Sequence, residues 1–281
     1  MDIRAQKEKA EELRRFHHGP RALVLPNVWD VATARIVEAA GFPAVATTSA
    51  GIAASFGYAD GQRISRQEML GTVANIARAA HVPVTADMEA GYGITPEDMA
   101  ETAERLIETG AVGLNLEDTI GRGDDCQVSL SLQVEKIRSL REASAAQGIP
   151  LVLNARTDIY LLGIGDPATR FDRTVQRLRA YRDAGADCLF APGVRDTDTI
   201  RKLIEAIEAP LNILAGPGSP SIPELESLGV ARISLGSSLA RAALTKAIDA
   251  VKELRKTGTY SVLEGSLSHT DVNNIFQKPS P

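Results

Sequence analysis

Short apolar runs alternate with helical segments along almost the whole chain, and no other pattern in it limits the possible folds as much. Runs this short suit strands that are buried on both faces. They lie at 22–25, 44–47, 82–86, 112–116, 151–153, 188–190, 211–214 and 233–235. Helical patterns follow them near 30–40, 65–80, 96–109, 132–147, 168–184, 195–207, 221–228 and 237–256. Eight such units with right-handed crossovers close most simply into a (β/α)8 TIM barrel.

Turn residues between the segments favour the same α/β architecture. Gly41, Gly110 and Gly185 follow predicted helices, where glycine readily takes the left-handed conformation just after the helix end. Thr95-Pro96 is typical of a helix start, with an N-cap followed by proline. A doubly wound open sheet is the alternative fold. Such a sheet normally carries a GxGxxG turn after its first strand, whereas here residues 26–30 read PNVWD.

The domain organisation predicted from this pattern is a single barrel over residues 1–281. Residues 1–20 contain an N-terminal helix, and residues 256–281 form a C-terminal helical tail whose end, 278–281, is expected to fray. No change in composition marks a linker, and a single barrel of roughly 250 residues fits the length of the chain.

Charge and composition exclude several classes of protein. The formal net charge is −5, so the overall charge balance does not favour binding to nucleic acid or an anionic membrane. The sequence has no apolar run long enough to span a membrane, and its charged N-terminus has no signal core. The two cysteines, Cys126 and Cys188, form no CxxC motif and suit a reducing compartment. We therefore expect a cytoplasmic protein that binds neither nucleic acid nor membranes.

Carboxylates gather at the predicted C-terminal ends of neighbouring strands, where barrel enzymes place their active sites. Asp87 and Glu89 end the third strand and share one face of it, while Glu117 ends the fourth. Three close carboxylates cannot all stay ionised unless a cation offsets their charge. Oxygen donors without a nearby histidine favour Mg²⁺, with Mn²⁺ as the second choice. The alternative is that these acidic residues only cap the helices that follow.

Two further segments supply groups that suit an anionic ligand. Arg156 follows the fifth strand, and its partner is either an anionic substrate or, alternatively, the carboxylate of Asp118 or Glu117. Residues 49–51, Ser-Ala-Gly, offer a hydroxyl group and small side chains that let backbone N–H groups approach an anion. On spacing alone, 49–51 could equally be a simple tight turn.

The histidines argue against two common kinds of catalytic site. They lie away from the predicted strand ends, at His17, His18, His81 and His269. A histidine-based zinc site or a Ser–His–Asp triad is therefore not expected. The loops at 216–219 and 236–238 are rich in glycine and serine, as in barrels that bind phosphosugars, but such residues also form ordinary turns.

Three segments resemble the isocitrate lyase/phosphoenolpyruvate mutase superfamily. They read ADMEAGYG at 86–93, GLNLED at 113–118 and NARTD at 154–158, in this order and one strand apart. The resemblance extends from residue 25 to residue 236. It implies a (β/α)8 barrel that assembles as a homodimer or homotetramer and often exchanges its last helix between subunits. It also implies Mg²⁺-assisted making or breaking of a C–C or C–P bond beside a 2-oxo acid, through an enolate.

The resemblance also implies roles for individual residues. Asp87 looks like the direct metal ligand and part of the substrate site, while Glu89 and Glu117 match positions that hold the metal through water. Asp60, Glu117 and Arg156 are the predicted catalytic residues, with Asp60 near metal and substrate and Arg156 on the anionic substrate. The remaining predicted substrate-binding residues are Ser49, Ala50, Gly51 and Asn212.

The chain also departs from the superfamily at the groups that define each reaction. The isocitrate and methylisocitrate lyases carry a Lys/Arg-Cys-Gly-His loop after strand four, but residues 119–127 here read TIGRGDDCQ. Cys126 is a candidate acid/base near the right place, although the neighbouring Asp124 and Asp125 should raise its thiol pKa. The loop of the phosphoenolpyruvate mutases is also missing. The glutamate often found after strand six in the lyases is replaced by Ala191-Pro192-Gly193.

Three functional hypotheses follow from these observations. The first is a lyase that cleaves a C–C bond in, or decarboxylates, a small 2-hydroxy or 2-oxo dicarboxylate. Decarboxylation needs only enolate stabilisation and a late proton donor, so it tolerates the altered loop best. The second is phosphonopyruvate-type C–P chemistry. The third, from another class, is a non-catalytic protein that binds a metal and a 2-oxo acid.

Overall fold

All the strands belong to one parallel sheet that wraps into a barrel. The computed structural model describes residues 2–121 and 126–277, and the order of strands in the sheet is β1-β9-β8-β7-β6-β5-β4-β3-β2. The strands are β1 (Leu23–Leu25), β2 (Asn27–Val28), β3 (Val45–Thr47), β4 (Val84–Asp87), β5 (Gly113–Glu117), β6 (Val152–Arg156), β7 (Cys188–Phe190), β8 (Leu211–Leu214) and β9 (Arg232–Ser234). The predicted TIM-barrel architecture is confirmed.

The barrel closes through a first strand that is split in two. β1 pairs with β9, β2 pairs with β3, and only Pro26 separates β1 from β2. Proline has no N–H to give to a sheet, so the chain breaks its pairing there and changes partner. The sequence-based prediction of a strand at 22–25 therefore missed β2, the second half of this split strand.

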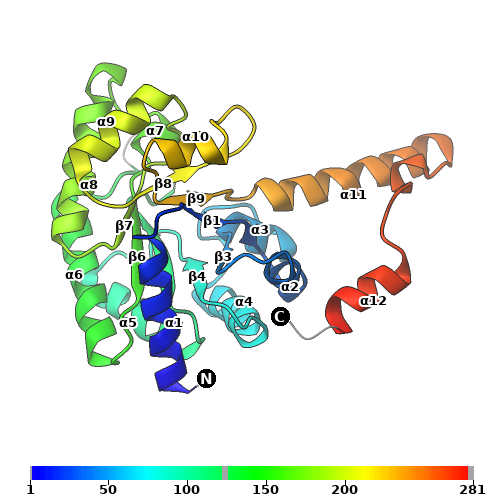
Figure 1. The fold of residues 1–281 in the computed structure, drawn as a ribbon, viewed down its shortest axis with the longest axis horizontal. Coiled ribbons are helices and arrows are strands. Elements are labelled where there is room, and N and C mark those ends of the chain that lie inside the picture. Colours follow the sequence, from blue (N-terminus) through cyan, green and yellow to red (C-terminus); the bar gives the residue numbers. More distant parts are fainter. Residues whose placement is uncertain (1, 122–125, 278–281) are drawn as a thin grey trace.

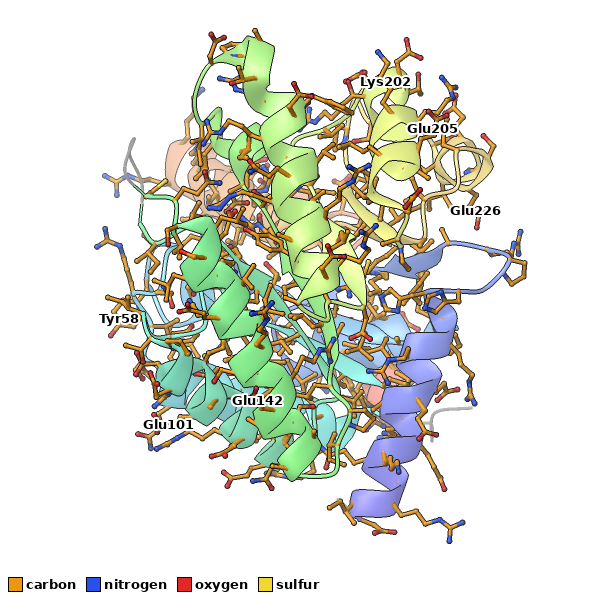
Figure 2. The ribbon with its side chains drawn as sticks, turned by 90° about the vertical axis from the view of Figure 1, so that its left-hand side faces the viewer. Tyr58, Glu101, Glu142, Lys202, Glu205 and Glu226 are labelled. Carbon is orange, nitrogen blue, oxygen red and sulfur yellow. The ribbon has the colours of Figure 1, made fainter. Side chains whose placement is uncertain are left out.

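Helices surround the barrel, and their outer faces carry charged side chains. Figure 2 shows the side of the molecule on which α6 and α9 lie, where Glu142 on α6 and Lys202 and Glu205 on α9 project outward. The α-helices are α1 (Ile3–Phe16), α2 (Val31–Ala39), α3 (Ser49–Ser55), α4 (Arg66–Ala79), α5 (Pro96–Glu108), α6 (Leu130–Ala146), α7 (Ile159–Leu162), α8 (Arg170–Asp183), α9 (Thr197–Ile207), α10 (Ile222–Ser227), α11 (Ser238–Thr257) and α12 (His269–Gln277). Short 3₁₀ turns lie at Pro167–Thr169 and Ser261–Leu263.

Side chains alternate between the barrel interior and the layer under the helices. Leu114 and Leu116 on β5 and Ile233 on β9 belong to the large apolar cluster between sheet and helices. Their neighbours Asn115 and Arg232 therefore point into the barrel, because successive residues of a strand face opposite sides. Barrels of this type usually fill that space with branched apolar residues. Here the middle of the barrel is polar.

The C-terminal part of the chain leaves the barrel. α11 extends away from the body, and the chain then returns so that α12 lies toward α2 (Figure 1). Large apolar side chains are exposed along this segment, among them Leu244, Ile248, Val251, Leu254 and Phe276.

Several elements differ from the sequence-based expectation. α3 and α7 were not predicted as separate helices, because both are short and lie inside loops that follow strands, whereas α12 lies within the predicted C-terminal helical tail. The expected fraying at 278–281, and the effect of Asp124 and Asp125 on Cys126, concern positions outside the described residues. No described helix is both long and apolar enough to cross a membrane.

Candidate active site

Asp87 occupies the last position of β4, and the first turn of α3 holds one of its two carboxylate oxygens. The backbone N–H and the hydroxyl of Ser49 donate to Asp87 Oδ2 at 3.0 and 2.7 Å. The Asp87 N–H donates to Thr47 Oγ1 at 2.8 Å, which ties β4 to β3. The other oxygen, Asp87 Oδ1, is buried and has no hydrogen-bond partner among residues 2–121 and 126–277. A buried carboxylate oxygen without a partner is costly, so this atom is suited to an incoming cation or donor.

Glu89 follows two residues later but does not continue the strand. Its φ is +50°, a left-handed value that is strained for a residue other than glycine. The N–H of Gln62 donates to Glu89 Oε2 at 2.5 Å, and the Tyr92 hydroxyl donates to Oε1 at 3.2 Å. The prediction that Asp87 and Glu89 share one strand face was wrong in this respect, since β4 ends at Asp87.

Strain is concentrated around Glu89. Gln62 and Tyr92 also have positive φ values, +53° and +58°, and the Tyr92 N–H donates to Gln62 Oε1 at 2.8 Å. These two residues and Glu89 are thus joined by three hydrogen bonds, which connect the loop carrying Asp60 to the end of β4. Strained backbone of this kind persists only where surrounding contacts fix it, and it is common at functional sites.

Arg156, at the end of β6, lies between two carboxylates. Its Nη1 is 2.8 Å from Glu117 Oε2, and its Nε is 2.6 Å from Asp158 Oδ1. The guanidinium also lies over the ring of Phe190, 5.8 Å from the ring centre. Of the two ion pairs considered as alternatives for Arg156, the one with Glu117 is therefore formed. Because both partners accept from fixed directions, the plane of the guanidinium is set.

The local electrostatics reflect an excess of negative charge. Burial, reinforced by the nearby Asp87, raises the pKa of Glu89 to about 7. Burial also raises the pKa of Glu117 well above its usual range, although Arg156 acts in the opposite direction. Each of these carboxyls is harder to ionise chiefly because it is buried, and the carboxylates close by add to the effect.

A buried lysine supports the loop that carries Glu89. Lys136 on α6 is completely buried, and its Nζ donates to the carbonyl oxygens of Ala90 and Gly93 at 2.6 and 3.3 Å. Burial lowers its pKa to about 8. The ammonium group therefore fixes two carbonyl groups of the turn after β4, behind the acidic cluster.

The acidic residues and Arg156 described above surround a cavity at the C-terminal ends of the strands. Its two lobes have volumes of about 400 and 140 Å³. Ser49, Asp60, Arg156 and Leu161 line both lobes, so the two form one site. Glu89, Glu117 and Asp158 line the larger lobe, whereas Asp87, Asn115 and Ala50 line the smaller one.

A comparison with protein families identifies the family of the chain. A family model described as phosphoenolpyruvate phosphomutase matches residues 13–255. The chain belongs to this family. The sequence-based assignment to the isocitrate lyase/phosphoenolpyruvate mutase superfamily, whose chemistry is that of lyases, is confirmed, and with it the prediction that the chain is an enzyme.

Individual relatives extend the comparison. A solved structure from Burkholderia cenocepacia J2315, assigned only provisionally as a lyase/mutase, is 42% identical, with a TM-score of 0.91 and 98% coverage of each chain. An oxaloacetate decarboxylase from Bradyrhizobium diazoefficiens is 28% identical over 98% of this chain and 94% of its own. The structure of an oxaloacetate acetylhydrolase in complex with the product oxalate is 26% identical, with a TM-score of 0.84 and coverage of 95% and 93%.

In this member of the phosphomutase family, most of the predicted site residues lie together. The cavity is lined by Ser49, Ala50, Asp60, Asp87, Glu89, Glu117 and Arg156. Gly51 is not among the lining residues, because it packs against Trp29 and Ala240, where a Cβ atom would come within 3.0 and 3.2 Å of theirs. The catalytic and binding roles of the predicted site residues stay predictions.

Two other predicted residues lie away from the cavity wall. Asn212 is completely buried inside the barrel, where the Ser234 hydroxyl donates to its Oδ1 at 3.1 Å. Cys126 is also buried, and its carbonyl oxygen accepts from the N–H of Ile120. Neither lines either lobe in the described part of the chain.

Sequence reasoning missed several residues of the site, four of which bear most on its chemistry. Asp158 and Thr119 line the larger lobe and are joined by a 2.7 Å hydrogen bond, Asn115 lines the smaller lobe, and Gln62 holds Glu89. Asn115 lies two residues before Glu117, and Asp158 two residues after Arg156. The two-residue repeat along a strand could have indicated Asn115, but no sequence signal indicates Gln62.

The oxygen donors present fit the chemistry of a hard divalent cation, and the role of Asp87 as its direct ligand stays a prediction. Among the described residues, nothing hydrogen-bonds to Asp87 Oδ1, and burial, together with repulsion between carboxylates, raises the pKa values of Glu89 and Glu117. Within residues 2–121 and 126–277, however, no three acidic, histidine or cysteine side chains converge as a complete ligand set. Glu89 is turned to Gln62 and Glu117 to Arg156, so these two suit contact through water. Mg²⁺ commonly keeps several waters in this way.

Proposed function

We propose that the chain is a Mg²⁺-dependent lyase that acts through an enolate on a small 2-oxo or 2-hydroxy dicarboxylate. Decarboxylation of an oxaloacetate-like acid is the reaction that its residues suit best. The observation that carries this proposal is the state of Asp87. One oxygen is held by Ser49, and the other has no partner in the described part of the chain, at the cavity that Arg156 also lines.

Arg156 and the start of α3 provide the groups that bind an anionic substrate. The guanidinium of Arg156 lines both lobes and is fixed by Glu117 and Asp158, so it offers donors in a set direction. Ser49 and Ala50 also line the smaller lobe, where the N–H and the hydroxyl of Ser49 already donate to Asp87 Oδ2. A dicarboxylate bound between them places its keto group beside Asp87. Positioning of this kind contributes to catalysis because the reacting groups need little further ordering.

Asp87, with Glu89 and Glu117 acting through water, would hold the metal. Mg²⁺ supplies, when bound, a Lewis acid that stabilises the negative charge developing on an enolate oxygen. The chain itself adds the fixed positive charge of Arg156 near that oxygen.

Decarboxylation makes modest demands on the rest of the site. The C–C bond to the leaving carboxylate breaks, its electron pair forms the enolate of pyruvate, CO₂ departs, and the enolate carbon then takes up a proton. Asp60 and Arg63 at the rim of the larger lobe are exposed, so water can reach this carbon. No cysteine acid/base is needed, which agrees with Cys126 lying away from the cavity wall.

Two of the relatives support this choice of substrate class. One is named an oxaloacetate decarboxylase, and the other is an oxaloacetate acetylhydrolase with bound oxalate. Oxalate is a planar dianion that resembles the enolate of pyruvate in shape and charge. A site that binds oxalate strongly is therefore suited to enolate chemistry.

We also propose that the chain forms a homodimer or homotetramer through α11 and α12. Ile248, Val251 and Phe276 are 51%, 65% and 40% exposed on a segment that stands away from the barrel (Figure 1). An exposed apolar face of this length marks an interaction surface. A second copy of the chain is the occupant that the family resemblance implies.

The test is an assay of a panel of 2-oxo and 2-hydroxy diacids, with phosphonopyruvate included, for release of pyruvate or glyoxylate. We expect release from at least one diacid with Mg²⁺ and none after treatment with EDTA. Activity that survives EDTA would refute the metal-dependent mechanism. Turnover of phosphonopyruvate alone would favour C–P chemistry instead, and binding of oxalate without turnover of any acid would favour a non-catalytic protein.

A further inference from the structure

Arg232 on β9 places a charged group in the middle of the barrel without a charged partner. Its side chain is completely buried, and in the part of the chain that the structure describes no carboxylate lies within ion-pair distance of it. Its Nε and Nη1 atoms have no hydrogen-bond partner, while Nη2 donates to Asn115 Oδ1 at 3.2 Å. Burial lowers the pKa of Arg232 to about 10, and the negative charge of Asp87 opposes this shift.

A buried charge without a counterion destabilises a fold, so an apolar residue at this position would serve stability better. Within the described residues, the one hydrogen bond of the Arg232 side chain goes to a residue of the candidate active site, since Asn115 lines the smaller lobe together with Asp87. The placement of Arg232 is therefore better explained by what it does to Asn115 than by packing.

The hydrogen bond to Arg232 decides which end of the Asn115 amide faces the cavity. A guanidinium can only donate, so the atom of Asn115 that it contacts must be the carbonyl oxygen. Asn154 Nδ2 donates to the same oxygen at 2.8 Å. The remaining atom, Asn115 Nδ2, has no hydrogen bond to the described residues, and it is not among the buried atoms that lack a partner. Because Asn115 lines the cavity and is 6% exposed, its NH₂ group is the part that meets the cavity.

We propose that Asn115 is a substrate-binding residue whose NH₂ group donates to an oxygen of the anionic substrate, and that Arg232 is its positioning residue. Arg232 never touches the substrate. It holds the carbonyl end of Asn115 inside the barrel and so keeps a donor, rather than an acceptor, directed at the ligand. Asn115 pairs with Asp87 across β4 and β5, so this donor lies beside the carboxylate on which the proposed function depends.

This inference rests on the proposed function, and binding of oxalate in the presence of Mg²⁺ tests the two separately. Asn115→Asp keeps the shape of the side chain and an acceptor for Arg232 and Asn154, but it replaces the donor with a negatively charged oxygen. We expect oxalate affinity measured by calorimetry to fall about 100-fold, because a hydrogen bond to a charged ligand is lost and a repulsion is added. Thermal unfolding should show that the variant is folded.

The role of Arg232 is tested by a double-mutant cycle. Arg232→Met should weaken oxalate binding about tenfold in the wild-type chain and raise KM more than it lowers kcat. It should have no further effect in the Asn115→Leu background, because Arg232 acts through Asn115. Arg232→Lys should restore part of the affinity. The matched control is Thr85→Val, which removes another buried, unpartnered polar atom of the barrel interior and should leave binding unchanged.

The outcomes separate the two proposals. If the wild-type chain binds no oxalate with Mg²⁺, the proposed function fails and this inference fails with it. If the wild-type chain binds but folded Asn115→Asp binds equally well, the assignment of Asn115 alone is wrong. If Arg232→Met weakens binding equally with and without Asn115, Arg232 acts by long-range charge and its positioning role is overturned.

Discussion

Single buried side chains set the properties of this barrel interior. Among the residues that the structure describes, Asp87 Oδ1 and Asn154 Oδ1 have no hydrogen-bond partner, and Arg232 has no carboxylate within ion-pair distance. Each arrangement costs stability in a folded chain. Such costs at neighbouring positions of one barrel are expected where selection has favoured a binding site over a stable core.

His17 makes a prediction at this scale, because the fold keeps it neutral. It is 3% exposed, and burial, aided by the charge of Arg232, lowers its pKa from the ordinary 6.5 to about 4. Between these two pH values the unfolded chain binds more protons than the folded chain. The contribution of neutral His17 to the free energy of unfolding is therefore complete above pH 6.5. As the pH falls toward 4, the free energy of unfolding decreases by ~3 kcal/mol.

The prediction is checked by urea unfolding at several pH values. His17→Gln should flatten the fall in the free energy of unfolding between pH 6.5 and pH 4, whereas His18→Gln, at the exposed neighbouring position, should not. Equal slopes for wild type and His17→Gln would show that His17 is not held neutral by the fold.

At the scale of elements, the barrel depends on how its split first strand is held. Asn27 on β2 is buried, and its Oδ1 accepts from the N–H groups of Leu235 and Gly236 at 2.9 and 2.8 Å. Its Nδ2 donates to the carbonyl oxygen of Thr47 at 2.8 Å. One side chain thus connects the end of β9 with β3 across the break at Pro26.

Asn27→Ala removes these three hydrogen bonds and leaves two backbone N–H groups without a partner. We expect the free energy of unfolding to fall by about 3 kcal/mol, at roughly 1 kcal/mol for each bond. Asn75→Ala on the exposed face of α4 is the control and should change stability by less than about 0.5 kcal/mol. Denaturant unfolding measures both, and similar small values for the two variants would mean that Asn27 does not hold the seam.

The elements also show how far sequence reasoning reaches. The strand–helix alternation predicted the barrel, and the convergence of strand ends predicted that Asp87, Glu117 and Arg156 would lie together. It did not predict the left-handed turn at Glu89, because that conformation depends on contacts from Gln62, which is distant in the sequence. Long-range contacts of this kind leave no local pattern in a single sequence.

Residues can also lie at the predicted place without the predicted surroundings. Gly51 is on α3 next to Ser49 and Ala50, but the helix turns it toward Trp29. Asn212 is on β8 as expected, yet its side chain lies deep in the barrel interior. Spacing identifies which strand or helix carries a residue, whereas depth within the barrel depends on the stagger of the strands.

At the scale of the whole molecule, the exposed apolar face of α11 predicts self-association. Ile248→Asp combined with Val251→Asp should convert the proposed homo-oligomer to a monomer, because two charges would have to be buried at the contact. Lys246→Asp is the control, since position 246 lies on the opposite side of the helix from Ile248. Light scattering after size exclusion gives the mass. A wild-type monomer, or an oligomer that persists in the double variant, would contradict this assignment.

The central claim is that Asp87 anchors a Mg²⁺-dependent site for enolate chemistry, and the most direct test is the rate of pyruvate release from oxaloacetate as Mg²⁺ is titrated. We expect the wild-type rate to rise with Mg²⁺ and to saturate. Folded Asp87→Asn should show no release above the uncatalysed rate at any Mg²⁺ concentration. A wild-type rate that is independent of Mg²⁺, or an Asp87→Asn variant as active as wild type, would contradict the account.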